Sequence, residues 1–243
     1  MKILAVNGSP KGAAGNTDVL VQAFLSGAED AGATTETVYL KDRTIHHCQG
    51  CFSCWTKTPG ECIHDDDMAD LLIRLRAADV YVAASPLYGN MVTGLMKDFM
   101  DRTLPLSHPA IVKQGDEYLH PRRYDDGVYR TVLITNAGFP ETHHFEGLRT
   151  TFAISTSGPR AALAGMICCA GGPMLKAPGM EDAVRWYIDA TTQAGREVVE
   201  LGSITPETQA ILDRPLSGDP GMYADVVNTH WRSYGVEMPE GET

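Results

Sequence analysis

Apolar runs alternate along most of the chain with segments whose apolar residues recur at helical spacing. The first run, Lys2 to Asn7, is almost continuously apolar, which is typical of a strand with helices on both faces. Similar runs predict further strands at 35–40, 80–84, 130–135 and 162–169. Because strands that alternate with helices form parallel sheets, the pattern predicts an α/β protein with a doubly wound, five-stranded parallel sheet.

Helical periodicity fills the intervals between these strands. After the first strand, apolar residues from Val19 to Ala28 share one helical face, and Gly32 stands where a helix would end. Further helices are predicted over 68–78, 94–103, 145–156, 181–201 and 206–212. Residues 104–128 are rich in Pro, His and charge and show no regular period, so we interpret them as an insertion.

These elements predict one elaborated domain over residues 1–202, with a cysteine loop at 45–64 and the insertion at 104–128. Residues 203–243 are a predicted C-terminal extension with one short helix followed by a tail punctuated by Pro and Gly. The tail contains Tyr223, Trp231 and Tyr234. Because aromatic side chains are rarely left in water, we expect the extension to pack on the body or on a neighbouring subunit.

Composition excludes some classes of partner. The 243 residues include 20 Lys and Arg against 31 Asp and Glu, a net charge of −11, which would repel nucleic acid and anionic membranes. No apolar run approaches the roughly 20 residues that span a bilayer, and Met1 leads into a strand without a signal-peptide pattern. We therefore expect a soluble cytoplasmic protein with no membrane or nucleic-acid partner.

Ligands of open parallel sheets bind beyond the carboxyl ends of the strands, and three predicted loops lie there. The first, residues 8–17, lacks the sequence of a nucleoside-triphosphatase loop and lacks G-x-G-x-x-G in register. Its glycines, the side chains of Ser9, Asn16 and Thr17, and the following helix N-terminus could hold a single phosphate group. A tight turn is the alternative.

The other two loops offer features suited to a planar ring. In residues 85–91, Pro86 and Gly89 shape a turn and Tyr88 offers an aromatic face, although a plain structural loop has the same composition. In residues 136–144, Gly138 permits close backbone approach. His143 and His144 in that loop are candidates for acid–base groups, metal ligands or ordinary helix-start residues.

A group of four cysteines suggests metal or redox chemistry. Cys48, Cys51, Cys54 and Cys62 are separated by two, two and seven residues. In a chain without a secretory signal we expect reduced thiols, for which metal or redox use is more common than disulfide bonding. Four thiolates suit a [4Fe-4S] cluster, and structural zinc and free, redox-labile thiols are the alternatives.

Several short motifs together resemble the NAD(P)H-dependent FMN reductase superfamily, and specifically its iron-sulfur flavoprotein branch. The motifs cover residues 1–103 strongly and 129–201 only in outline. They are Gly8-Ser-Pro10 with Gly15-Asn-Thr17, the cysteine spacing from Cys48 to Cys54, Asp66-Asp-Met68, Ala78-Asp79, Pro86-x-Tyr88-Gly-Asn90, Leu95-x-Lys97 and Asp101-Arg102. The resemblance implies a flavodoxin-like sheet of order 2-1-3-4-5, FMN as prosthetic group, and a homodimer or homotetramer.

The resemblance also implies roles for individual residues. By position, the FMN phosphate would be held by Ser9, Lys11, Asn16 and Thr17. The isoalloxazine would be bordered by Pro86, Leu87, Tyr88, Gly89, Asn90 and Met91, with Asn136 and Gly138 on its other side. In this branch the four cysteines bind a [4Fe-4S] cluster.

The function expected from these features is that of an FMN oxidoreductase. It would take electrons from NAD(P)H at flavin N5 and pass them to a small-molecule or redox-protein acceptor, through the cluster if one is bound. No catalytic side chain is expected, because Tyr88, Asn90 and Gly138 need only shape the ring pocket. The alternatives are a one-electron carrier without NAD(P)H turnover and a redox or metal sensor based on the cysteine loop.

Overall fold

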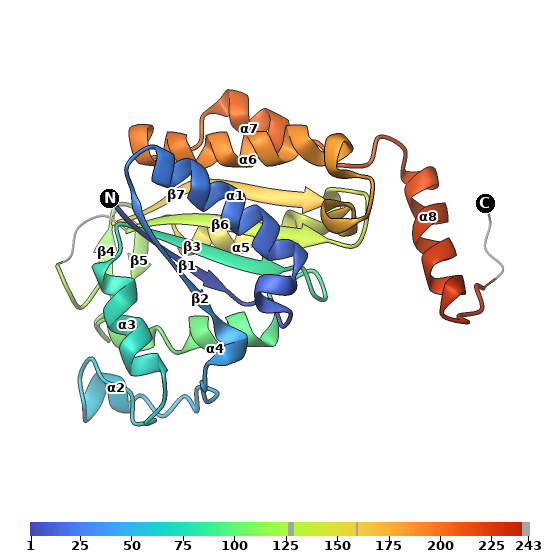
Figure 1. The fold of residues 1–243 in the computed structure, drawn as a ribbon. Helices are drawn as coiled ribbons and strands as arrows, with labels where there is room; N and C mark the ends of the chain where they lie inside the picture. Colours follow the sequence, from blue (N-terminus) through green and yellow to red (C-terminus); the bar gives the residue numbers. More distant parts are fainter. Residues whose placement is uncertain (126–128, 159, 240–243) are drawn as a thin grey trace.

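The computed structural model describes residues 1–125, 129–158 and 160–239, which form a parallel sheet between two layers of helices (Figure 1). Its five strands are β1 (Lys2–Asn7), β2 (Thr34–Tyr39), β3 (Val80–Pro86), β6 (Tyr129–Ala137) and β7 (Ala161–Ala170). They lie in the order β2-β1-β3-β6-β7, and each neighbouring pair is parallel. Counted within the sheet, this is the order 2-1-3-4-5, so the flavodoxin-like fold is confirmed.

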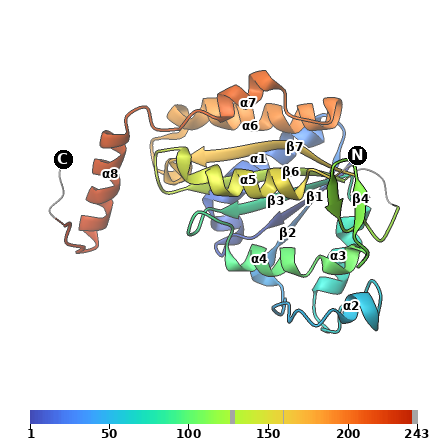
Figure 2. The same ribbon diagram turned by 180° about the vertical axis from the view of Figure 1, so that it is seen from behind.

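Each face of the sheet is covered by its own set of helices (Figures 1 and 2). One face packs against α1 (Asn16–Asp30) and α6 (Glu181–Leu201), with α7 (Pro206–Leu212) alongside α6. The other packs against α3 (Met68–Ala77), α4 (Gly94–Asp101) and α5 (Glu146–Ser155). Burial on both faces explains why the central strands β1 and β3 read as continuous apolar runs.

Close helix packing explains two glycines on the first face. A Cβ at Gly27 of α1 would overlap the backbone carbonyl of Thr192, and one at Gly195 of α6 would overlap the carbonyl of Phe24. These glycines therefore let α1 and α6 approach each other at backbone distance. Their contact holds the N-terminal helix firmly on the sheet.

The predicted bounds of these sheet strands and covering helices differ from the observed ones by at most two residues. The insertion is more ordered than expected: it contains a 3₁₀ turn, η3 (Leu104–Leu106), and an antiparallel hairpin of β4 (Val112–Gln114) and β5 (Glu117–Leu119). Its last positions, 126–128, lie outside the described residues. The cysteine loop contains one short helix, α2 (Ser53–Thr56).

The prediction of an irregular tail was wrong for α8 (Pro220–Ser233). This helix extends beyond the carboxyl ends of the strands, away from the body (Figures 1 and 2). Tyr223 at its start is buried, whereas Trp231 and the following Tyr234 are exposed. Residues 240–243 lie outside the described part. None of the described helices is long and apolar enough to cross a membrane.

Candidate functional site

Three loops meet at the edge of the sheet where β1, β3 and β6 end (Figure 1). The chain leaves β1 to form β2 on one side and later returns as β3 on the other side. The loops after β1 and β3 therefore flank the point where the strand order reverses, which is where ligands of open parallel sheets bind. The loop after β6 adjoins them, because Leu87 N–H donates to Asn136 O at 2.8 Å.

The loop after β1 forms a close-packed cradle in front of α1. Gly12, in the short 3₁₀ turn η1 (Gly12–Ala14), has φ of +53°, and a Cβ at Gly15 would lie only 2.7 Å from Ser9 Oγ. Gly15 is also the N-cap of α1, and no side chain caps the helix there. Uncapped N–H groups and the helix dipole favour an anion, so this cradle fits a phosphate group.

The residues predicted to hold a phosphate all lie around this cradle. The side chains of Ser9 and Thr17 are buried, Asn16 is half-buried, and Lys11 is exposed. Ser9 N–H donates to Asn7 Oδ1 at 2.9 Å, which fixes the start of the loop in a local turn. The start of the loop is therefore fixed, and the exposed Lys11 places a cation at its rim.

Sequence reasoning missed a second cation at this loop. Lys176, in the 3₁₀ turn η5 (Gly172–Lys176), donates from Nζ to Ala14 O at 2.9 Å. The two residues are 162 positions apart, so only the fold brings them together. Lys176 supplies positive charge beside the N-terminus of α1.

The loop after β3 is a tight turn with unusual backbone geometry. Tyr88 N–H donates to Met91 O at 2.9 Å, and Met91 N–H donates to Tyr88 O at 3.0 Å. Gly89 and Asn90 have φ of +55° and +60°, as a type I′ turn requires. Tyr88 is 54% exposed, so its aromatic face is free to contact a ligand, while Pro86 and Leu87 are half-buried.

The loop after β6 is joined directly to the phosphate cradle. The buried Asn136 side chain donates from Nδ2 to Thr17 Oγ1 at 2.7 Å. Gly172 fits against Asn136, because a Cβ there would lie 2.6 Å from Asn136 Oδ1. Gly138, two residues further on, is exposed. The predicted phosphate and ring residues are therefore parts of one connected site.

An aromatic group forms the outer rim of the β6 loop. Phe139 is 57% exposed, and its ring stacks on the His144 ring with 4.5 Å between the ring centroids. The centroids of the His144 and His143 rings are 4.1 Å apart. His144 Nε2 is 3.7 Å from a Glu141 carboxylate oxygen. Both histidines lie in η4 (His143–Phe145) immediately before α5, which is the helix-start position considered among the alternatives.

The four clustered cysteines are free thiols in different environments. Cys48 and Cys51 are exposed, Cys62 is half-buried, and Cys54 is buried beside the start of α2. Hydrogen bonds from Ser53 lower the pKa of Cys51, whereas burial and the neighbouring cysteines raise that of Cys54. Among the described residues, no three His, Cys, Asp or Glu side chains are arranged to hold a metal ion. The thiols have the chemistry that a cluster needs, but in this arrangement they are not a ready ligand set.

A buried ion pair, not foreseen from the sequence, closes the base of the cysteine loop. Asp66 accepts two hydrogen bonds from Arg102, at 2.8 and 3.0 Å, and one from His46 N–H at 2.9 Å. Arg102 also donates to His46 O at 2.7 Å. Because His46 precedes Cys48 and Asp66 follows Cys62, the pair joins the two ends of the cysteine segment.

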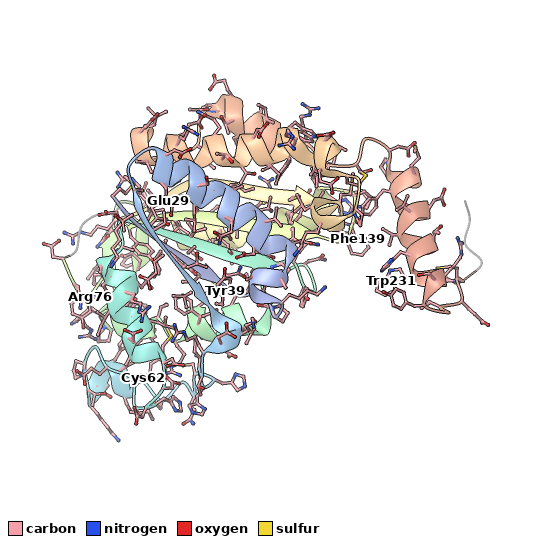
Figure 3. The ribbon with its side chains drawn as sticks, in the orientation of Figure 1. Glu29, Tyr39, Cys62, Arg76, Phe139 and Trp231 are labelled. Carbon is pink, nitrogen blue, oxygen red and sulfur yellow. The ribbon has the colours of Figure 1, made fainter. Side chains whose placement is uncertain are left out.

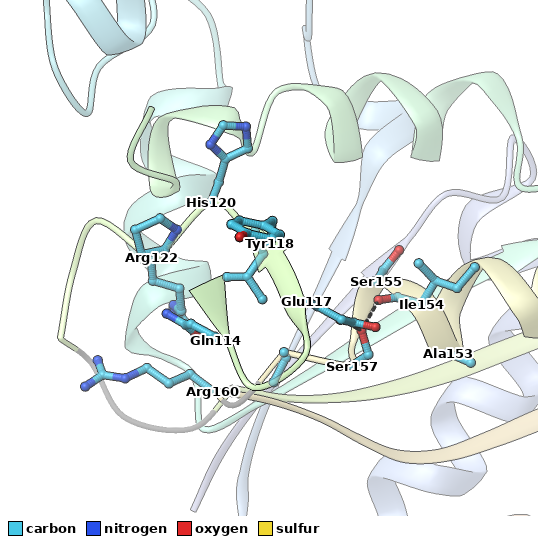
Figure 4. Close-up of a pocket in the computed structure, with 14 residues that line it drawn as sticks. Gln114, Glu117, Tyr118, His120, Arg122, Ala153, Ile154, Ser155, Ser157 and Arg160 are labelled. Carbon is cyan, nitrogen blue, oxygen red and sulfur yellow. Dashed lines mark hydrogen bonds between the residues drawn. The ribbon is translucent and has the colours of Figure 1, made fainter. Parts of the chain in front are cut away.

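The end of the cysteine segment lies away from the three loops, whereas His47 near its start bonds Asp98 on α4, the helix whose N-cap Thr93 donates to Gly8 O. Figure 3 shows Cys62 beside α2 and Phe139 beside α8. A cavity of about 1050 Å³ also lies away from the three loops, between the β4–β5 hairpin and the end of α5 (Figure 4). Its lining includes Tyr118, Ile154 and Arg160 but none of the predicted site residues.

Comparison with known proteins agrees with the motifs. Residues 1–115 match the family model of NADPH-dependent FMN reductase. An iron-sulfur flavoprotein of Archaeoglobus fulgidus is 37% identical over 113 residues, which is 46% of this chain and 50% of the relative. One from Methanosarcina thermophila is 31% identical over 106 residues, 44% of this chain and 54% of the relative. The matched region thus spans about half the length of these curated relatives.

Solved structures are similar in fold at low sequence identity. The NAD(P)H:quinone oxidoreductase of Methanothermobacter marburgensis has a TM-score of 0.58 at 16% identity, covering 82% of this chain and 96% of its own. An FMN-dependent NADH-azoreductase of Bacillus anthracis, solved with FMN, has a TM-score of 0.58 at 14% identity, covering 82% and 100%. Residues 1–115 are therefore similar to the NADPH-dependent FMN reductase family, and the similar proteins include iron-sulfur flavoproteins.

Proposed function

We propose that this protein is an FMN-dependent oxidoreductase that takes electrons from NAD(P)H and delivers them to a small-molecule or redox-protein acceptor. The observation that supports this most directly is the hydrogen bond from Asn136 Nδ2 to Thr17 Oγ1. It joins the cradle in front of α1 to the β6 loop, which the bond from Leu87 N–H to Asn136 O joins in turn to the β3 loop. A ligand with a phosphate at one end and a flat ring at the other fits this combination.

In this proposal the phosphate lies at the N-terminus of α1. Ser9, Asn16 and Thr17 supply side-chain donors, and the uncapped amides of the helix supply backbone donors. Lys11 and Lys176 offset the charge of the dianion in a chain that is otherwise acidic. Lys176 is an addition to the residues that the family motifs indicate.

The flavin ring would lie between the other two loops. Pro86, Leu87 and the Tyr88–Met91 turn border one side, with Tyr88 as a stacking face, and Asn136 and Gly138 border the other. Bound flavin accepts hydride from a nicotinamide and returns one or two electrons to an acceptor. The role of the chain is to fix the ring, present backbone donors to it and leave one face open. In this proposal, electron transfer from the nicotinamide to the flavin does not depend on the cysteines.

The first test is FMN binding, with Asn16→Ala/Thr17→Ala as the phosphate-site variant. We expect the purified protein to bind FMN and the variant to bind it at least about tenfold more weakly, because hydrogen bonds to a charged group are lost. Binding is measured by quenching of flavin fluorescence. Affinity for riboflavin, which lacks the phosphate, should fall by a smaller factor, because only the bond from Asn136 Nδ2 to Thr17 Oγ1 is lost at the ring side.

Thr56→Ala removes an exposed hydroxyl from α2 and is the matched control. Urea unfolding separates loss of binding from loss of structure. Equal FMN affinity in the wild type and the double variant would contradict the phosphate assignment. Oxidation of NADH or NADPH with a small quinone then tests the activity; an FMN-loaded protein that oxidises neither nucleotide would favour the one-electron carrier.

A further inference from the structure

Helix α8 in the C-terminal extension contacts the body through one buried aromatic residue. Tyr223 is 8% exposed, whereas Met222, Val226 and Trp231 on the same helix are 69%, 69% and 49% exposed. The Tyr223 ring packs at Gly171, where an added Cβ would lie 3.6 Å from Tyr223 Cε2. Its hydroxyl donates to Gly138 O at 2.8 Å, across 85 positions of sequence.

That hydrogen bond is one of three in which backbone carbonyls of the β6 loop accept from other parts of the protein. Asn136 O accepts from Leu87 N–H, Gly138 O from the Tyr223 hydroxyl, and Phe139 O from Gly171 N–H, each at 2.8 Å. Within the described part of the chain, the N–H groups of Gly138 and Phe139 are directed at no acceptor of the protein. Because a trans peptide unit directs its carbonyl and the N–H of the next residue to opposite sides, the bond to Gly138 O turns the Phe139 N–H away from Tyr223.

We infer that Tyr223 is a positioning residue for the flavin ring: by holding Gly138 O, it directs the Phe139 N–H, which belongs to the same peptide unit, at the ring's polar edge. This inference rests on the proposed function, because it assumes that a flavin occupies the site. It assigns a role to a segment outside the region that matches the reductase family, which ends at residue 115. The C-terminal extension is then part of the cofactor site.

The chemistry of Tyr223 suits this role. A tyrosine hydroxyl donates one hydrogen bond when protonated, and burial raises the pKa of Tyr223 to about 12, so the donor is intact at neutral pH. Pre-oriented N–H groups cost no reorganisation when a ligand binds, and they favour negative charge on the ring. Without the Tyr223 bond, the Gly138 peptide gains freedom to rotate, and binding must then restrict it.

The experiment compares the full-length wild type with Tyr223→Phe, which removes the hydroxyl and keeps the ring. We expect affinity for FMN and for riboflavin to fall by the same factor, about three- to tenfold, because the altered contact is at the ring. The midpoint potential of the bound flavin should also become more negative, since the reduced, more anionic ring loses oriented donors. Met222→Ala, an exposed neighbour on α8, should change neither quantity.

A second measurement uses the wild type alone. Binding of FMN should slow hydrogen exchange at the Phe139 amide, observed by NMR, and absence of protection would overturn the inference even if Tyr223→Phe unfolds. Equal affinities and potentials in the wild type and a folded Tyr223→Phe variant would also overturn it and leave the proposed function standing. Failure of the wild type to bind either flavin would instead reject the proposed function on which the inference depends.

Discussion

Asp66 is the residue whose charge has the clearest structural consequence. Burial alone would raise its pKa, but hydrogen bonds from Arg102 and from the N–H groups of His46 and Met68 lower that pKa to about 2. A carboxyl group whose pKa is lower in the folded state than in the unfolded chain stabilises the folded state. This stabilisation is fully present at pH values above the pKa of the unfolded chain, which is near 4. That contribution, about 2 kcal/mol, is lost as the pH falls from about 4 to about 2.

We therefore expect Asp66→Asn to lower the free energy of unfolding by about 3 to 5 kcal/mol at neutral pH, because Arg102 is left buried without its counter-charge. Urea unfolding at pH 7 and at pH 3 measures the effect, which should be smaller at the lower pH. Asp65→Asn, at an exposed neighbour, is the control and should have little effect. Equal stability of the two variants would show that the ion pair does not hold the segment.

Residue roles were predictable where they follow from local sequence and not where the fold creates them. The acids at 65–67 stand immediately before the predicted helix at 68–78, and Asp66 accepts from Met68 N–H at 3.1 Å. Its bonds to Arg102, 36 positions away, have no local signal in the chain. The same holds for Lys176 beside Ala14 and for Tyr223 on Gly138, because both contacts depend on how distant elements pack.

The Tyr88–Met91 turn provides a test at the level of an element. Gly89 has φ of +55° and faces open space, so an added Cβ costs conformational energy without a clash. We expect Gly89→Ala to destabilise the turn by about 1 kcal/mol and to weaken FMN binding, because Tyr88 and Asn90 lose their fixed positions. Thermal unfolding and fluorescence titration measure the two effects.

Gly94→Ala is the matched control for this substitution. Gly94 begins α4, also faces open space and does not have a positive φ, so alanine there should be neutral or slightly stabilising. An unchanged FMN affinity in Gly89→Ala would mean that the turn does not contact the ring.

Elements with strong periodicity were predicted well, and irregular segments were not. The strands and the helix at 181–201 have continuous or amphipathic patterns that survive packing. The β4–β5 hairpin has only three residues in each strand, too few to show alternation. For α8 a signal was present: Asp219 accepts from Gly221 and Met222 N–H, and Pro220 follows it, which is a helix-start pattern. The Pro and Gly there were instead interpreted as marks of an irregular tail.

At the scale of the whole molecule, Cys62 in the cysteine segment and Phe139 at the three loops lie on different sides of the body (Figure 3). The three loops lie beside α8, and the cysteine segment packs against α4 and the insertion, as shown by His47 with Asp98 and by Trp55 Nε1 donating to Leu104 O at 3.2 Å. No hydrogen bond or ion pair described for the cysteine segment reaches the loops after β1, β3 or β6. The fold therefore predicts that the two regions bind and react independently within one chain.

Selective alkylation tests that independence. Cys51 is exposed and its pKa is lowered by Ser53, so it should react with iodoacetamide ahead of the buried Cys54, Cys168 and Cys169, whose pKa values are raised by burial. Peptide mass spectrometry identifies the site, and Cys51→Ser is the control for reagent effects elsewhere. Once Cys51 is modified, FMN affinity should stay within about twofold of that of the untreated protein, because no hydrogen bond or ion pair described for the cysteine segment reaches the three loops. A larger loss of FMN affinity that does not occur in the treated Cys51→Ser variant would contradict this independence. It would show that modification of the cysteine segment affects the proposed flavin site, either through the sheet or through contact between two copies of the chain.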